Sequence, residues 1–500
     1  MRSAPSTAVY INLLKGCIRE KSLSYARHVY SHLVKHRSHP VCNGLLGDYV
    51  VEVFSTCGSL DEAYRVSQRF PRRSVFCWTS IISSYTNSGR VHEALSLYRE
   101  MKDEGIEPNH STFASLFKAC GSIPHYEEGK KLHKLALKRG FASDAFVGTA
   151  LMNMYNKFGN ISEAESVFRD MSRRDIISWT TMLTLYVDNG HGKKALQLFR
   201  EMQVRCGSAL LDDRVFVVSL QACGILAEDE NEGKLTKEKC LHILRAMFND
   251  SHVKECSTSI HVATTLINTY AKCGSMSEAE SVFNAIIVRD LVSWNAMLTA
   301  YVEKGEGAKA LDLYKQMQDE NVIQDDVTLI CILLSCGETE NCEMCKQLHF
   351  GIVHVKCDSI PAVVSSLIYA YGNCARMIDA HICFHYFPEP DTASWNACIV
   401  GYSGEANYTG ALSMFENSKL EGIIPDEITF TSVLSACTHT GHVIEGILYF
   451  ESMSRDNGLD PHMQHNSILV DLFARAGDFS RIEYIVESRC QTIRMSGSFF

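Results

Sequence analysis

Few residues of this 500-residue sequence combine the types and the spacing that chemistry requires. The strongest set is Cys342-x-x-Cys345 followed by His349, because two thiolates and an imidazole at short spacing are donors that Zn²⁺ prefers. No motif for a catalytic nucleophile and no glycine-rich phosphate loop accompanies this set. The sequence therefore predicts a protein without catalytic residues or cofactor. Whether the Cys/His set binds a metal depends on the elements that hold it.

The composition is that of a globular chain. Apolar residues make up 46% and charged residues 21%, which excludes global disorder. The formal net charge of −10 argues against a broadly basic nucleic-acid surface, so such binding would have to be local. No apolar run reaches the roughly 18 residues of a membrane span. The 20 cysteines are expected to be reduced, because a chain of this length can build a core without disulfides.

An internal repeat decides the predicted fold. The four tryptophans are Trp78, Trp179, Trp294 and Trp395, and the first two and the last two are each 101 residues apart. The middle interval is 14 residues longer, which we assign to two extra residues before 212 and twelve around 227–239. Shorter blocks keep the same register, namely CGSLDEA (57–63), FGNISEA (158–164), CGSMSEA (273–279) and CARMIDA (374–380).

The 101-residue period divides into three kinds of repeat, about fourteen in all. The tryptophan repeats are 75–109, 176–212, 291–325 and 392–426, and the short repeats are 44–74, 145–175, 260–290, 361–391 and 463–488. The third kind occupies 7–43, 110–144, 213–259, 326–360 and 427–462, and residues 489–500 are a non-repeat tail.

Each repeat is predicted to form two helices. In 75–109, Ile81, Ile82 and Tyr85 share one helical face, and Gly89 supplies a left-handed helix end before a second apolar stripe. One alanine recurs where close helix contact would exclude larger side chains: Ala63, Ala94, Ala164, Ala195, Ala279, Ala310, Ala380 and Ala411. A single hairpin cannot bury its apolar faces, so we expect an all-α fold, a right-handed superhelical solenoid of stacked hairpins.

The register also gives structural roles to conspicuous residues. The tryptophans are expected in the core rather than stacked on bases. His349 occupies the repeat position of His133, which favours a repeat feature over a metal site. Eight cysteines at two repeat positions are expected to be small buried hydrophobes: Cys17, Cys57, Cys120, Cys223, Cys273, Cys336, Cys374 and Cys437. Arginines near the repeat ends, such as Arg73, Arg174 and Arg289, would contact phosphates or compensate a helix C-terminus.

The phrases VFCWTSIISSY, MNMYNKFGNISEAESVF, RDLVSWNAML and TFTSVLSACTHTGHVIEG resemble the pentatricopeptide repeat family. The alternation of 35, 35 and 31 residues resembles its plant-type form, whose tryptophan, third-kind and short repeats are called P, L and S. The resemblance covers residues 7–488. It implies binding of single-stranded RNA, with one base per repeat read by two or three side chains. It also implies a location in the mitochondrion or chloroplast.

The resemblance further implies that the fifth and the last residue of a repeat read the base. In the P repeats these pairs are Thr79 with Asn109, Thr180 with Asp212, Asn295 with Asp325 and Asn396 with Asp426. In the S repeats they are Thr149 with Asp175, Thr264 with Asp290 and Ser365 with Asp391. The family's pairing implies A for Thr–Asn, G for Thr–Asp and Ser–Asp, and U over C for Asn–Asp. The implied target is 5′-A-n-G-G-n-G-U-n-G-U-n, with n opposite the L repeats. Asp48 with Ser74 departs from the pattern and has no assigned base.

Other positions complete the implied interface. Four apolar residues at the second position of their repeats look like the family's base-sandwiching residues: Phe76, Phe146, Ile177 and Val292. The alternative role for Asp175, Asp290 and Asp391 is a helix N-cap. The polar fifth position lies inside a helix and has no capping role, which favours base reading.

Long plant-type members often end in a zinc deaminase domain, which needs an H-x-E followed by P-C-x-x-C. That combination is absent here, and the residues from 484 depart from the family's C-terminal motifs. We therefore expect a protein that recognises a C-to-U editing site or another RNA-processing site, with the reaction supplied in trans by a deaminase or other processing protein. The N-terminal MRSAPSTAVY is mildly transit-like but too short for a complete transit peptide. The alternative is a peptide-binding scaffold of tetratricopeptide type.

Overall fold

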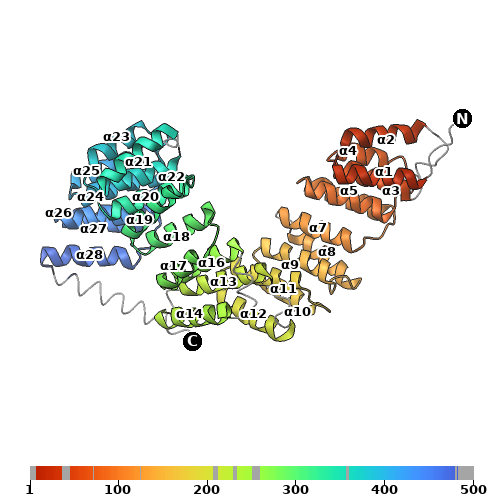
Figure 1. Ribbon diagram of the computed structural model, residues 1–500, viewed down its shortest axis with the longest axis horizontal. Coiled ribbons are helices and arrows are strands. Elements are labelled where there is room, and N and C mark those ends of the chain that lie inside the picture. Colours follow the sequence, from red (N-terminus) through yellow and green to blue (C-terminus); the bar gives the residue numbers. More distant parts are fainter. Residues whose placement is uncertain are drawn as a thin grey trace. The chain divides into compact units, whose positions relative to one another are not determined.

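The computed structural model describes residues 7–35, 45–70, 72–123, 126–206, 212–228, 233–249, 259–355, 360–478 and 481. Every regular element in these ranges is a helix (Figure 1). The chain divides into two compact parts, residues 1–256 and 257–500, which we describe separately. The predicted tail 489–500, the end of the last S repeat (482–488) and the end of the first L repeat (36–43) lie outside the described residues.

Each predicted repeat except the last supplies a first and a second helix to its part of the chain, and the described residues of repeat 463–488 contain only its first helix. In the first part the first helices are α1 (Thr7–Glu20), α3 (Leu45–Thr56), α5 (Val75–Asn87), α7 (His110–Ser122), α9 (Ala145–Lys157), α11 (Ile176–Asp188) and α13 (Asp213–Glu228). The second helices there are α2 (Leu23–Lys35), α4 (Leu60–Ser67), α6 (Val91–Asp103), α8 (Tyr126–Lys138), α10 (Ile161–Asp170), α12 (Gly192–Cys206) and α14 (Gly233–Asn249).

The second part continues in the same order. Its first helices are α16 (Ile260–Lys272), α18 (Leu291–Glu303), α20 (Asp326–Glu338), α22 (Pro361–Asn373), α24 (Thr392–Gly404), α26 (Glu427–Thr440) and α28 (Met463–Ala476). Its second helices are α17 (Met276–Ala285), α19 (Gly307–Asp319), α21 (Cys342–Val355), α23 (Met377–Tyr386), α25 (Tyr408–Leu420) and α27 (Val443–Asn457).

Neighbouring hairpins stack through their first helices. Helix α5 packs against its own second helix, α6, and also against the next first helix, α7, and α6 in turn contacts α7. The same contacts join α18 to α19 and α20 in the second part. Within each part the first helices therefore form one continuous layer. This is the all-α solenoid that the repeat period predicts.

The tryptophans lie in the core, as expected. Trp78 and Trp294 are fully buried, and Trp179 and Trp395 are nearly so. Trp179, Trp294 and Trp395 each make an edge-to-face contact with a phenylalanine of the preceding short repeat. The ring centroids of Phe283 and Trp294, for example, are 5.1 Å apart. The eight recurring alanines are buried as well, with at most 1% of their surface exposed. Residues with a fixed repeat position are thus the ones that join one hairpin to the next.

The recurring cysteines are mostly core residues. Cys17, Cys120 and Cys336 are fully buried, as are Cys223 and Cys437, whereas Cys57 and Cys374 are only partly covered. Burial raises the pKa of the Cys336 thiol to about 12. A thiol with such a pKa remains protonated at neutral pH, which suits a packing role rather than a reactive one.

Two arginines resolve the open choice at the repeat ends. Arg174 donates from Nε to the Phe168 carbonyl at 2.9 Å, at the end of α10. Arg289 makes the equivalent bond to the Phe283 carbonyl at 3.3 Å, at the end of α17. Both guanidinium groups also lie over the ring of the following tryptophan. These two arginines therefore compensate helix C-termini and cover the core.

Part of the twelve-residue insertion around 227–239 lengthens two helices. Helices α13 and α14 contain 16 and 17 residues, whereas α5 and α6 contain 13 each. The residues between them, 229–232, lie outside the described ranges. The described residues of this stretch are therefore helical.

Candidate nucleic-acid interface

Helix geometry brings the predicted reading positions together. The fifth residue of a repeat lies in the second turn of its first helix, and the last residue immediately precedes the first helix of the next repeat. Since consecutive first helices pack against each other, the two positions meet across the junction between repeats. The pair Asn295 and Asp325, for example, joins α18 to the start of α20.

Every predicted last residue caps the helix that follows it. In the P repeats the caps are Asn109, Asp212, Asp325 and Asp426, and in the S repeats they are Asp175, Asp290 and Asp391. In each case Oδ1 accepts the backbone N–H of the third helical residue at 2.8–2.9 Å. The alternative role as helix N-caps, which the sequence suggested, is therefore confirmed. Capping uses one side-chain oxygen of each residue, and base reading remains a prediction.

The fifth residues contact two different kinds of partner. Asn295 donates from Nδ2 to both carboxylate oxygens of Asp325, at 2.9 and 3.1 Å, and Asn396 donates to Asp426 at 3.0 Å. Thr180, by contrast, donates to its own helix at the Ile176 carbonyl, 2.7 Å away. Two of the predicted pairs are thus directly bonded.

The fifth residues expose less of their surface than residues that line an open groove would. Asn396 exposes 5% of its surface and Asn295 exposes 9%, because the next first helix packs over them. Thr180 and Thr264 are equally covered, whereas Thr79, Thr149 and Ser365 are half-buried. The small exposed fraction of the two asparagines restricts the atoms that a ligand could reach.

One cavity collects all three predicted positions of a single repeat. Ile177, Thr180 and Asp212, the second, fifth and last residues of repeat 176–212, line a cavity of about 220 Å³ together with Asn153 and Arg214. It offers an apolar surface, a hydroxyl, a carboxylate and a guanidinium in one place. This combination can hold a flat polar ring.

The second positions carry exposed apolar side chains. Phe146, Ile177 and Val292 expose about three fifths of their surface and Phe76 almost half. Large exposed apolar residues that recur at one repeat position indicate a binding surface within each part of the chain. Sequence reasoning missed three further residues at this repeat position, Leu45, Val327 and Ile428, which are 42–64% exposed. Their shared repeat position was the signal that could have found them.

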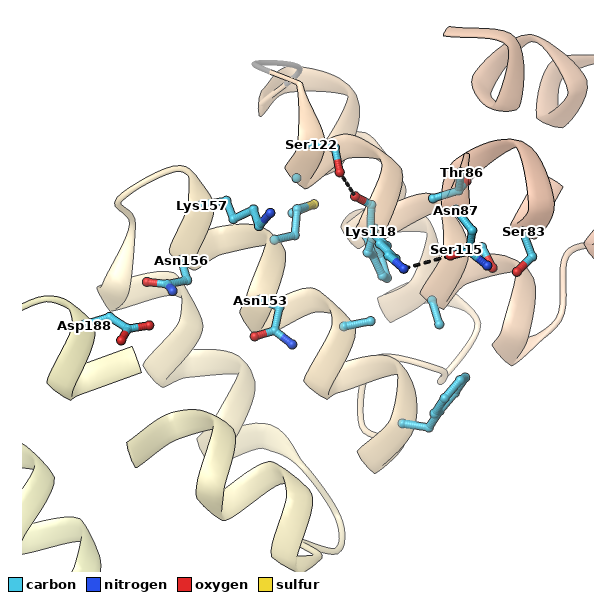
Figure 2. A pocket seen from close by; sticks show the side chains of 16 residues that line it. Ser83, Thr86, Asn87, Ser115, Lys118, Ser122, Asn153, Asn156, Lys157 and Asp188 are labelled. Carbon is cyan, nitrogen blue, oxygen red and sulfur yellow. Dashed lines mark hydrogen bonds between the residues drawn. The ribbon is translucent and has the colours of Figure 1, made fainter. Parts of the chain in front are cut away.

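A larger cavity of about 600 Å³ lies along the first helices of the first part. Figure 2 shows its polar side chains coming from four successive first helices, with Asn87 on α5, Lys118 on α7, Asn153 and Lys157 on α9 and Asp188 on α11. Phe146 also lines this cavity. Lys118 donates to Asn87 Oδ1 at 2.8 Å. Local positive charge therefore lies beside an exposed aromatic ring although the chain is acidic overall.

The Asn295–Asp325 pair carries a fixed negative charge. Burial alone would raise the pKa of Asp325, but bonds from the Thr328 backbone and from the side chains of Asn295 and Thr328 outweigh it. The pKa of this carboxyl is therefore held below its usual value. Asp325 is ionised at neutral pH and acts only as an acceptor.

The histidine of the Cys/His set contacts side chains of the next repeat. His349 Nδ1 lies 3.0 Å from the Tyr371 hydroxyl, and His133 makes the equivalent contact with Tyr155 at 2.7 Å. His349 Nε2 faces the Cys383 thiol at 3.9 Å. In the described part of the chain, no group of three or more His, Cys, Asp or Glu side chains is arranged to hold a metal ion. Among the same residues, no helix combines the length and apolar character that a membrane span needs.

Sequence comparisons identify the repeats. The model of the PPR repeat family matches residues 73–122, 289–337 and 390–439, and that of the PPR repeat matches 149–176, 177–206, 262–291 and 428–457. A mitochondrial pentatricopeptide repeat-containing protein of Arabidopsis thaliana is 31% identical over 96% of this chain and 67% of its own length. The chain belongs to the pentatricopeptide repeat family. A chloroplastic family member of the same plant is 30% identical over 93% of this chain and 56% of its own length.

Solved structures of the pentatricopeptide repeat family include PPR10 from maize. Its crystal structure aligns with 98% of this chain and 85% of its own length, with a TM-score of 0.47 and 16% sequence identity. PPR10 has also been crystallised in complex with an 18-nt psaJ RNA element, and that structure aligns with a TM-score of 0.41. The division of the present pentatricopeptide repeats into P, L and S kinds remains a prediction from the sequence.

Proposed function

We propose that this pentatricopeptide repeat protein binds single-stranded RNA in a sequence-specific manner, one nucleotide per repeat. The observation that carries the proposal is the cavity where Ile177, Thr180 and Asp212 meet. An apolar surface can cover the face of a base while the hydroxyl and the carboxylate contact its edge. Single strands expose that edge, whereas base pairing covers it in a duplex.

The electrostatics support local contact with an anionic backbone. The chain has a net charge of −10, so general attraction to nucleic acid is not expected. Lys118 and Lys157 nevertheless line the 600 Å³ cavity beside Phe146. A few placed cations beside a ring suit a ligand that is read base by base and gripped at selected phosphates.

We further propose that the RNA is a transcript of the mitochondrion or chloroplast. This follows the names of two relatives, one of which is called mitochondrial and the other chloroplastic. There the protein would recognise a C-to-U editing site or another processing site. A deaminase or other RNA-processing protein would supply the reaction in trans.

A gel-shift experiment tests the proposal. The chain is titrated against 5′-A-n-G-G-n-G-U-n-G-U-n and against the complementary strand of the same length. Several mismatched positions at about 1–3 kcal/mol each predict more than about a hundredfold weaker binding of the complement. Equal, weak binding of both strands would contradict sequence-specific recognition and would favour a peptide-binding scaffold.

A further inference from the structure

The partner that the fifth residue contacts varies with the third residue of the following repeat. It is threonine at three of the seven junctions with an assigned reading pair. At these three, the fifth residue bonds to the threonine hydroxyl: Thr79 to Thr112 at 2.7 Å, Asn295 to Thr328 at 2.6 Å and Asn396 to Thr429 at 2.6 Å.

At the other four junctions the third residue is serine or valine, and the fifth residue bonds back to its own helix. Thr149, Thr264 and Ser365 donate to backbone carbonyls three or four residues earlier, at 2.7, 2.9 and 3.2 Å. The serines that follow them bond instead to the capping aspartate, as Ser293 does to the Asp290 carbonyl at 2.7 Å.

The fourth of these junctions carries Val215, which has no hydroxyl. There Thr180 bonds to the Ile176 carbonyl. The seven junctions thus divide without exception according to whether a threonine is present.

Counting protons shows what the threonine does. Thr328 Oγ1 lies 2.6 Å from Asn295 Oδ1 and 2.9 Å from Asp325 Oδ1, and its single proton can serve one of them. The Asn295 nitrogen already donates to the carboxylate. The amide is therefore held with its oxygen toward Thr328 and its nitrogen toward Asp325. Since both oxygens belong to one carboxylate, a single N–H directed between them accounts for the two contacts, and the second N–H and one oxygen lone pair remain for a ligand.

Thr328 itself cannot contact a ligand. It is fully buried, as is Thr112, and Thr429 exposes only 2% of its surface. Any influence of these threonines on RNA must pass through the fifth residue.

We propose that Thr112, Thr328 and Thr429 are positioning residues that set how strongly their repeats discriminate between bases. The inference rests on the proposed RNA binding and deepens it. A threonine outside the repeat that reads the base holds the reading side chain in one orientation. Repeats followed by serine or valine lack this restraint and discriminate less.

The test compares Thr328→Val with the unmodified chain on two sets of four RNAs. One set differs only at the nucleotide opposite repeat 291–325, and the other only opposite repeat 392–426. Valine keeps the shape of threonine, and Val215 shows that the fold accepts it at this position. We expect the ratio of the largest to the smallest Kd to fall about fivefold to tenfold in the first set and to stay unchanged in the second.

Two further variants separate positioning from helix capping. Ser293→Ala removes a third-residue hydroxyl that does not contact a fifth residue, so discrimination opposite repeat 260–290 should be unchanged even if the melting temperature falls. Val215→Thr should increase discrimination opposite repeat 176–212.

The outcomes are distinguishable. If the unmodified chain discriminates and Thr328→Val discriminates equally well, or binds every RNA of both sets more weakly by one common factor, the positioning role is wrong. If the unmodified chain does not discriminate among the RNAs, the proposed function is wrong and the inference falls with it.

Discussion

Asn295 and Asp325 are 30 residues apart in the chain, yet the amide of one donates to both carboxylate oxygens of the other. Asn396 and Asp426 repeat the contact in the next P repeat of the same part, at 3.0 Å. In these two repeats the fifth and last residues therefore form one hydrogen-bonded unit before any ligand arrives. A change at either position alters the donors and acceptors that both can offer.

Replacing both asparagines by threonine tests the reading assignment. Asn295→Thr with Asn396→Thr converts two Asn–Asp pairs to Thr–Asp pairs, so we expect the preference opposite both repeats to move from U toward G. Each single variant should move the preference at its own nucleotide only. Binding measurements with RNAs substituted at these two positions check the prediction, and an unchanged preference at both would contradict base reading.

Phe146 is expected to contribute affinity without contributing stability. Its ring is 60% exposed and lines the 600 Å³ cavity. Phe146→Ala should raise the Kd for the target RNA at least about fivefold, as loss of about 1 kcal/mol of base stacking would. Its melting temperature should stay close to that of the unmodified chain. The matched control is Ile378→Ala on α23, where a 79% exposed apolar residue lies on a second helix; an equal loss of affinity there would refute the assignment.

Lys118 is expected to contact phosphate. Lys118→Gln should weaken binding of all RNA sequences by the same factor and lower the slope of log Kd against log salt concentration by about 0.7, the value for one contact to a single strand. Lys315→Gln is the control, because Lys315 lies on the second helix α19 and pairs with Asp312 at 3.0 Å. Base-dependent loss of affinity in Lys118→Gln would instead assign this residue to the base edge.

Two alanines occupy left-handed positions where other repeats have glycine. Ala406 has φ +54° where Gly305 has φ +67°, and Ala375 has φ +53° where Gly274 has φ +85°. An L side chain is strained in this region. Ala406→Gly should therefore stabilise the fold by about 0.5–1 kcal/mol after the entropic cost of glycine is subtracted. Denaturant unfolding measures the gain, and Gly305→Ala should show a loss; a lower midpoint for Ala406→Gly would contradict the prediction.

The contributions of Asp48 and Asp325 to folding stability should change in opposite directions with pH. Burial raises the pKa of Asp48, only partly offset by the hydrogen bond from Ser74 at 2.6 Å. Its folded-state pKa lies above the unfolded value, so the stability it contributes is present at low pH and is lost as pH rises through the folded pKa. Asp48→Asn should therefore melt at a higher temperature than the unmodified chain at pH 7, and the difference should vanish near pH 3.

Asp325 supplies the opposite sign. Its lowered folded-state pKa contributes stability above the unfolded value, and this stability is lost as pH falls through the folded pKa. Asp325→Asn should be less stable than the unmodified chain at pH 7, with the difference shrinking in acid. Parallel pH profiles for the two variants would contradict both assignments.

The hairpin stack was predictable because its signals are local and periodic. Trp78, Ala94 and Gly89 recur at fixed spacing, and each has one packing or backbone reason to be where it is. Helices α5, α18 and α24 begin at the first residues of the repeats assigned from that spacing. The His349 contact with Tyr371 likewise follows from the register that His349 shares with His133.

The candidate site was predictable only as a set of positions. The family resemblance supplied Asn295 and Asp325, but nothing in the sequence indicated that they bond to each other or that Asn295 is nearly buried. Thr328 escaped notice because its effect depends on the packing of α18 against α20, a contact between repeats that no motif within one repeat records.

The last residue of each assigned pair caps the next helix, and under the proposed function the same side chain would also contact a nucleotide. Good helix starters are few, chiefly Asp, Asn, Ser and Thr. The choice of side chains that could contact RNA at this position is therefore limited by folding as much as by the chemistry of the ligand. Engineered arrays that introduce other side chains there would exchange specificity for weaker junctions between repeats.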